Sequence, residues 1–124
     1  MAGQIDTIVA ELTGEMRLAM VDVTLEVHAA LVENTPVDTG NARANWICGI
    51  GDVPTAEVSD GAAQAAGIAA VLGYQVADGS TMIANNVEYL EYLINGSSTQ
   101  APAGWDLVAI ESGVAAAVAK AGAR

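Results

Sequence analysis

The chain has 124 residues and a mass of 12.5 kDa, which predicts a single domain over residues 1–124 with one modest core. Its 15 acidic and 4 basic residues give a net charge of −11, which disfavours nucleic acid and anionic membranes as ligands. We expect no membrane span, signal peptide or internal disulfide, because apolar runs are short, the first residues lack a basic and apolar leader, and Cys48 is the only cysteine.

A long amphipathic helix is predicted from about Ile5 to Glu33. Apolar residues recur there at spacings of three and four over about eight turns, and the acidic residues lie mostly off that stripe. One face of a small sheet cannot cover a helix of this length, so we expect part of the stripe to contact another chain. The stripe consists of Ile5, Ile8, Val9, Leu12, Met16, Ala19, Met20, Val23, Val27, Ala30 and Leu31.

A structural joint is predicted after this helix, made of Pro36, Val37, Asp38, Thr39 and Gly40. Pro36 biases the residue before it away from the helical conformation. The carboxylate of Asp38 can bond to the backbone two residues later, and Gly40 can adopt a positive φ at little cost. The joint holds no nucleophile, base or ligand set. It therefore favours a structural protein, whose shape matters, over an enzyme.

The rest of the chain predicts an α+β fold: the long N-terminal helix, a small antiparallel sheet with an intervening Ala-rich helix, and a C-terminal helix. Two strands alone are marginal in water. We therefore expect either a further short strand, for example in residues 73–76, or completion of the sheet by helices and neighbouring subunits. The predicted elements are a strand over Asn45–Val53, a helix to Leu72 with Ser59 or Asp60 as N-cap and Gly73 as its stop, a turn at 77–80, a strand over Thr81–Val87, a short helix over Glu88–Ile94, and a last helix over Trp105–Ala121 with Leu107, Val108, Ile110, Val114 and Val118 as its stripe.

No set of residues converges on a catalytic, cofactor or metal site. His28 is interpreted as a helix-packed or surface imidazole, because no cysteine or second histidine accompanies it. Cys48 alternates with apolar neighbours and is interpreted as a small buried hydrophobe. The carboxylates of Asp22 and Glu26 are four residues apart, a spacing typical of a solvated helix face.

Two motifs, about fifty residues apart, carry a resemblance. The first is TPVDTGNARANW over 35–46, and the second, over 85–104, contains NN, YLE, NG, QAP and a final glycine. In this order, behind a long N-terminal helix, they resemble the neck or tail-completion (head–tail joining) proteins of tailed bacteriophages, including the minor tail protein Z type. The resemblance covers roughly Ile8–Val118. It departs at Asn41, where many relatives carry a basic residue, and at Ser97, where relatives often have an aromatic residue.

The resemblance implies a non-enzymatic virion structural protein, made in the host cytoplasm and located at the head–tail junction. Its partners would be identical copies in a ring, together with head-closure, tail-terminator or tail-tube proteins, and DNA would pass through the lumen without sequence-specific binding. The ring could belong to the neck, to a tail terminator or to tail completion. The candidate interface residues are Arg43, Trp46, Tyr89, Glu91, Asn95, Gly96, Ser98, Gln100, Ala101, Pro102 and Gly104.

These interface assignments have structural alternatives. Arg43 can pair with an acidic partner or stack on an aromatic ring, or it can be solvated or paired within its own chain. Trp46 and Trp105 can anchor either the core or an interface. The loop over 96–104 can dock against a neighbour or simply connect two helices.

The net charge permits a second function, an acidic binding or regulatory module such as a DNA mimic or an antirepressor-like factor. Such a module would bind a basic partner with steep salt dependence. A ring subunit would instead show large apolar contacts. A small enzyme is not favoured by the residue inventory.

Overall fold

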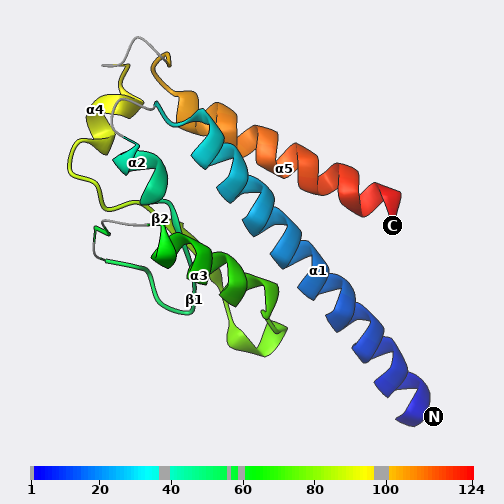
Figure 1. Cartoon of the computed structure of the whole chain (residues 1–124). Helices are drawn as coiled ribbons and strands as arrows, with labels where there is room; N and C mark the ends of the chain where they lie inside the picture. The colour runs from blue at the N-terminus through cyan, green and yellow to red at the C-terminus, as the bar shows by residue number, and fades with distance from the viewer. Residues whose placement is uncertain (1, 37–39, 56, 59–60, 97–100) are drawn as a thin grey trace.

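A computed structural model describes residues 2–36, 40–55, 57–58, 61–96 and 101–124 (Figure 1). Its fold is mixed helix and strand, as the sequence predicted. A long helix runs along one side, a second long helix packs against its C-terminal half, and the small sheet with its short helices lies on another side of it. The elements are α1 (Ala2–Asn34), α2 (Asn41–Ala44), β1 (Ile47–Ile50), α3 (Ala62–Leu72), the 3-10 helix η1 (Val76–Asp78), β2 (Thr81–Ala84), α4 (Leu90–Ile94) and α5 (Trp105–Ala123).

The sheet has two antiparallel strands, with Ile47 opposite Ala84 and Ile50 opposite Thr81. No further strand occurs in the described part of the chain, so the alternative of a third strand at 73–76 was wrong. Helices of the same chain pack on the sheet, as the other alternative expected, and its contact with neighbouring subunits stays a prediction. The hydroxyls of Thr24 in α1 and Thr81 in β2 are hydrogen-bonded at 2.6 Å, and α3 packs on β1.

Both strands are shorter than predicted, because polar side chains engage the residues on either side of them. The Asn45 side chain bonds to the backbone of Val58 and Asn41, which holds the chain out of the sheet before β1. Gly51 then turns the chain with a φ of 80°. After β2, the side-chain amides of Asn85 and Asn86 donate to carbonyl groups outside the sheet.

Helix α3 approaches β1 closely through a glycine. A Cβ atom at Gly67 would lie 2.6 Å from the carbonyl oxygen of Cys48, so only glycine fits there. The predicted stop at Gly73 is confirmed, since its N–H bonds to the carbonyls of Ala69 and Ala70. The predicted N-caps, Ser59 and Asp60, lie outside the described residues, and the residue that flanks the helix start is Gly61.

Helices α1 and α5 form the largest contact between elements. Their backbones approach closely at Gly113, where a Cβ atom would lie 2.5 Å from the Cα of Val27. Two ion pairs join α1 to the C-terminal end of the chain. They are Lys120 with Glu26 at 2.5 Å and Arg124 with Asp22. Figure 1 shows α5 running beside the C-terminal half of α1 only.

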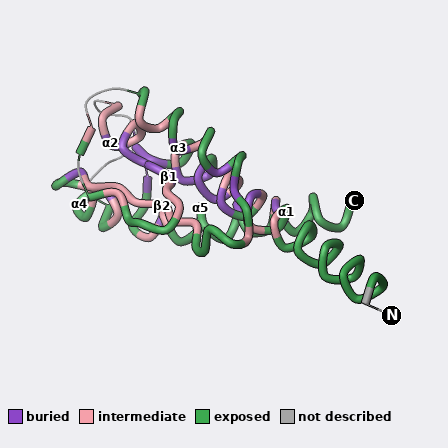
Figure 2. Tube along the Cα trace, turned by 90° about the horizontal axis from the view of Figure 1, so that it is seen from below, coloured by how far each residue is buried: buried purple, intermediate pink, exposed green. Residues whose placement is uncertain are grey.

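The core lies at one end of the molecule. Figure 2 shows buried residues along the C-terminal half of α1, β1 and α3, whereas the N-terminal half of α1 is exposed. One cluster joins α1 to the start of α5 and to α4, and a second joins α1 to β1 and to the end of α3. The first is Val27, Ala30, Leu31, Ala42, Trp46, Leu93, Ala101, Trp105 and Ala109, and the second is Val21, Cys48, Val71 and Tyr74.

Gly40 has the positive φ that the sequence predicted, at 76°. A Cβ atom there would meet nothing within 4 Å, so a side chain would be opposed by backbone strain alone. We expect Gly40→Val to lower the free energy of unfolding by about 1–3 kcal/mol, measured by thermal unfolding followed by circular dichroism. The control is Gly61→Val, at an equally open position with φ of −79°, and an equal loss in both variants would contradict the prediction.

Candidate functional site

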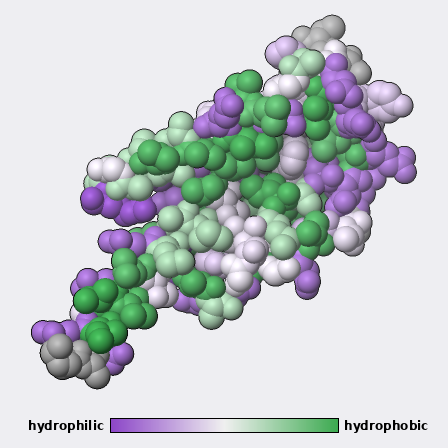
Figure 3. Space-filling model, turned by 180° about the vertical axis from the view of Figure 1, so that it is seen from behind, coloured by the Kyte–Doolittle hydropathy of each residue, from purple (hydrophilic) through white to green (hydrophobic). Residues whose placement is uncertain are grey.

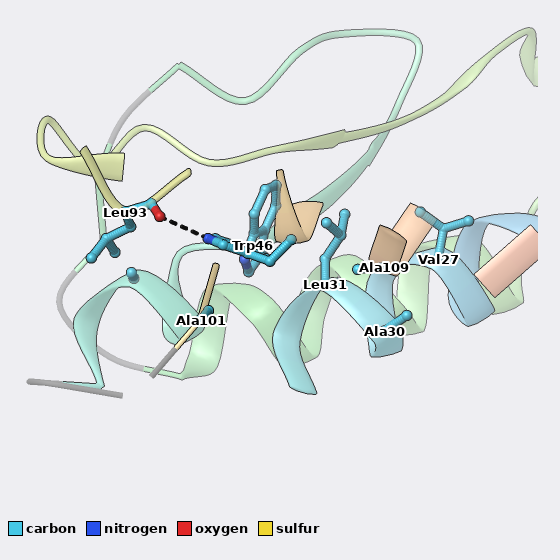
Figure 4. Close-up of a cluster of buried hydrophobic side chains, with 9 residues drawn as sticks. Val27, Ala30, Leu31, Trp46, Leu93, Ala101 and Ala109 are labelled. Carbon is cyan, nitrogen blue, oxygen red and sulfur yellow. Dashed lines mark hydrogen bonds between the residues drawn. The ribbon is translucent and has the colours of Figure 1, made fainter. Parts of the chain in front are cut away.

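The two sequence motifs meet in space at the C-terminal end of α1. The Asn85 side chain of the second motif donates to the carbonyl of Ala42 in the first at 2.8 Å. Trp46 of the first motif lies in one cluster with Ala101 of the second, and Figure 4 shows them with Leu93 and Leu31. The motif pair is therefore a packing unit that ties α1, α2, α4 and the start of α5 together.

Trp46 is held by hydrogen bonds on its side chain and its backbone. Its indole N–H donates to the hydroxyl of Thr35 at 2.7 Å, and that hydroxyl donates to the carbonyl of Leu31. The carbonyl of Trp46 accepts from Nε2 of His28 at 2.7 Å and from Gln64 at 3.2 Å. These bonds satisfy polar groups that the core buries. Trp46 is thus a core anchor of its own chain, one of the two alternatives that the sequence left open.

The second tryptophan fixes the start of α5. Trp105 is buried, and its indole N–H donates to the carbonyl of Leu93 at 2.9 Å. The N–H of Gly104 bonds to the carbonyl of Ile94, and both Gly96 and Gly104 have positive φ. The chain on both sides of the loop is therefore tied to its own core.

Arg43 engages its own chain. Its Nε donates to the carbonyl of Thr35 at 2.9 Å and its Nη2 to that of Glu33 at 3.0 Å, so the guanidinium caps the C-terminus of α1. Arg17 does the same for α3, donating to the carbonyls of Leu72 and Tyr74. The sequence did not predict this role for Arg17, because its acceptors lie more than fifty residues away along the chain.

The remaining candidate interface residues divide by exposure. Ala101 is buried and Gly104 is half-buried. Ser98 and Gln100, like the joint residues Val37, Asp38 and Thr39, lie outside the described residues, whereas Pro36 of the joint is buried. The candidates that the chain presents to solvent are Tyr89, Glu91, Asn95, Gly96 and Pro102.

The residues that the sequence analysis weighed for chemistry are engaged within the chain or buried. His28 is buried and hydrogen-bonded, and within the described ranges no three His, Cys, Asp or Glu side chains gather into a metal site. Asp22 accepts from Arg124, the residue after α5, and Glu26 accepts from Lys120 in α5. The hydrogen bond and the charge of Glu26 raise the pKa of Lys120. Cys48 is buried, as predicted.

Burial raises the pKa of the Cys48 thiol from 9.0 to about 11. The unfolded chain therefore loses this proton first, so the associated stability is complete below pH 9 and is lost as the pH rises towards 11. We expect the free energy of unfolding to fall by about 1–3 kcal/mol more in the wild type than in Cys48→Ala over this range. Urea unfolding of both proteins at a series of pH values measures it, and parallel curves would contradict it.

Large apolar side chains are exposed to solvent mainly on the two long helices (Figure 3). We name residues 3–16 of α1 the arm. Its large apolar side chains are all 55–61 % exposed, as expected for a stripe that is too long for its own fold. They are Ile5, Ile8, Val9, Leu12 and Met16.

The apolar stripe predicted for the last helix is also exposed, which is a correction. Leu107, Val108, Ile110, Val114 and Val118 face solvent, whereas Trp105, Ala109, Gly113 and Ala117 are buried against the core. Small residues at a spacing of four let α5 approach α1 closely, and this contact takes precedence over burial of the larger side chains.

In the described part of the chain, no helix combines the length and apolarity needed to cross a membrane. No protein-family model, curated protein or solved structure matches this chain.

Proposed function

We propose that this chain is a non-enzymatic virion structural protein of a tailed bacteriophage, a subunit of a ring around the DNA channel at the head–tail junction. The observation that carries the proposal is the exposed apolar face of the arm and of α5. The 15 acidic residues already make the chain strongly charged, so the exposed apolar face is not needed for solubility. Burying such a face against another protein is favourable, since burial of apolar surface is the main driving force of association. The motif pair supplies the resemblance to neck and tail-completion proteins.

The charge distribution supports a lumen that does not hold DNA. All four basic side chains, those of Arg17, Arg43, Lys120 and Arg124, are engaged within the chain. Because none of these four side chains is free to form a basic patch, a chain with a net charge of −11 repels phosphate. DNA slides more easily past a surface that does not bind it. Neighbouring neck and tail proteins would then bind through the exposed residues near α4 and the loop before α5.

The test is made on particles. Mass spectrometry of purified virions should detect the chain, and deletion of its gene should give filled heads and separate tails that a plasmid copy restores to infectious particles. Virions that lack the chain would refute the proposal, as would normal particles from the deletion.

A second candidate, the acidic binding or regulatory module, is favoured by the same engagement of the basic side chains. It requires a basic partner whose affinity falls steeply with added salt. Isothermal titration of partners captured from infected cells, at two salt concentrations, separates the two candidates.

A further inference from the structure

The outer edge of β2 presents backbone groups that nothing in the described part of the chain pairs. Ile50 lies opposite Thr81, and the next residue, Gly51, donates its N–H to the carbonyl of Ser80 at 2.9 Å. Hydrogen-bonded and non-hydrogen-bonded pairs alternate along an antiparallel ladder, so Thr81 and Ile83 belong to non-hydrogen-bonded pairs. Their N–H and C=O groups therefore point away from β1, and no hydrogen bond of the described residues ends on them.

The corresponding edge of β1 is closed by α3. A Cβ atom at Gly67 would lie 2.6 Å from the carbonyl oxygen and 3.1 Å from the nitrogen of Cys48, so the helix backbone lies against this edge. Gln64 of the same helix donates to the carbonyl of Trp46, the residue before the strand, at 3.2 Å. Over the described ranges, the open edge of the sheet is thus that of β2.

An open groove of about 220 Å³ runs along the free edge of β2. It is lined by Val23, Thr24 and Val27 of α1 and by three consecutive strand residues, 81–83. Consecutive residues of a strand point to opposite faces of the sheet, so a groove that contacts all three follows the strand backbone. The hydroxyl of Thr81 bonds to that of Thr24, so the side chains of residues 81 and 83 face α1. The groove therefore has room for the side chains that an added strand would direct towards α1.

The edge carries none of the features that keep strands apart. Natural proteins protect edge strands with charged side chains or proline. Residues 79–87 contain neither, although the chain as a whole has a net charge of −11. The nearest carboxylates along the chain are those of Asp78 and Glu88. A sheet of two strands is also marginal, so an added strand would stabilise it.

We propose that β2 of one copy pairs with β2 of a second copy, antiparallel and related by a twofold axis, in one continuous sheet. The free groups select this partner and its register, because the edge is complementary to itself. With Thr81 opposite Ile83 of the second copy, and Ile83 opposite the second Thr81, each pair exchanges both of its N–H···O bonds. All the free groups of both edges are then paired, in the self-complementary form of contact that twofold dimers use.

This register also keeps the acidic residues apart. Met82 lies on the axis, opposite Met82 of the second copy, so Asp78 falls opposite Asn86 and Glu88 falls opposite Val76. No two carboxylates of the edge segments are therefore paired across the contact. This inference goes beyond the proposed function and does not rest on it, so the virion test leaves it unaffected.

The residue on the axis allows a test by charge. Met82 belongs to neither core cluster. At high protein concentration the wild type should be a dimer by light scattering after gel filtration. Met82→Glu and Met82→Lys each place two like charges opposite each other, so each should be monomeric with the circular dichroism of the wild type. An equimolar mixture of the two variants should be dimeric again, because opposite charges then face each other.

Three results of this experiment would overturn the proposal. They are a monomeric wild type, a dimer that survives either substitution, and a mixture of the two variants that stays monomeric. The first of these would leave the edge to an extended segment of another protein.

Disulfide formation tests the register and does not depend on charge. The Cα atoms of a non-hydrogen-bonded antiparallel pair are about 4.5 Å apart, a distance that a disulfide spans. Met82→Cys should therefore give a disulfide-linked dimer under mild oxidation, seen on a non-reducing gel. The wild type, whose Cys48 is buried, should give none.

The matched control is Ala84→Cys, on the same strand and the same face and half-buried like Met82. In the proposed register residue 84 lies opposite Ser80 of the second copy, about 13 Å along the strand from the second residue 84. Ala84→Cys should therefore stay unlinked. Equal linkage of the two cysteine variants, or no linkage of Met82→Cys, would overturn the proposal.

Discussion

Replacing Trp46 with alanine is expected to lower the free energy of unfolding by about 3–5 kcal/mol. The side chain is 7 % exposed and lies in the cluster that joins the two sequence motifs. The variant loses this packing and also leaves the buried hydroxyl of Thr35 without the indole donor. Chemical denaturation followed by circular dichroism measures the loss.

The control for Trp46→Ala is Tyr92→Ala. Tyr92 is 69 % exposed on α4, so its truncation should change the free energy of unfolding by no more than about 0.5 kcal/mol. If Trp46 served only an interface between copies, the two isolated variants would lose the same small amount. The comparison therefore decides between the core and interface alternatives for this tryptophan.

Gly113→Ala is expected to destabilise the fold by about 1–3 kcal/mol, although helix propensity alone predicts a gain of about 0.5–1 kcal/mol. The new Cβ would lie 2.5 Å from the Cα of Val27 and 2.8 Å from the carbonyl oxygen of Glu26. These are backbone atoms of α1, so no side-chain rotation relieves the clash, and the two helices must move apart. Thermal unfolding of the purified variant shows the sign of the effect.

Gly122→Ala provides the matched control in the same helix. A Cβ atom at Gly122 would meet nothing within 4 Å, so this change should be neutral or slightly stabilising. A stabilising Gly113→Ala would mean that α1 and α5 are not in close contact at this point.

The sequence predicted the longer helices well, because local signals determine them, but it did not predict the short helix α2 or the 3-10 helix η1. The three-and-four spacing gave α1 from Ile5 to Glu33, against Ala2–Asn34 in the structure, and a single glycine at position 40 marked the left-handed residue before α2. The strands were predicted too long, since an asparagine such as Asn85 ends a strand only through an acceptor that is distant in sequence.

The face of α5 could not be predicted from hydrophobicity. Val114 and Val118 form a better apolar stripe than Gly113 and Ala117, yet the small residues are the ones buried. Close approach of two backbones depends on the absence of side-chain atoms, which a hydrophobic pattern does not register. The exposure of the larger residues is therefore visible only in the structure.

The candidate interface was predicted in part from residues that the chain uses internally. Arg43 caps α1, and Ala101 is buried. The residues of a motif that resembles a family's signature can serve packing within the chain as well as binding to a partner. The assignment of the exposed members, such as Tyr89 and Pro102, to an interface stays a prediction.

The contact between α1 and α5 has a consequence for synthesis on the ribosome. About seventy residues separate Asn34 at the end of α1 from Trp105 at the start of α5, so α1 emerges long before the helix that covers it. During that interval the face of α1 that α5 covers, around Val27, is exposed even after the sheet and α3 have packed on the helix, and exposed apolar surface of this kind makes a folding intermediate prone to aggregation. We expect packing of α5 on α1 to be a late step of folding, because it joins segments that are far apart in the sequence.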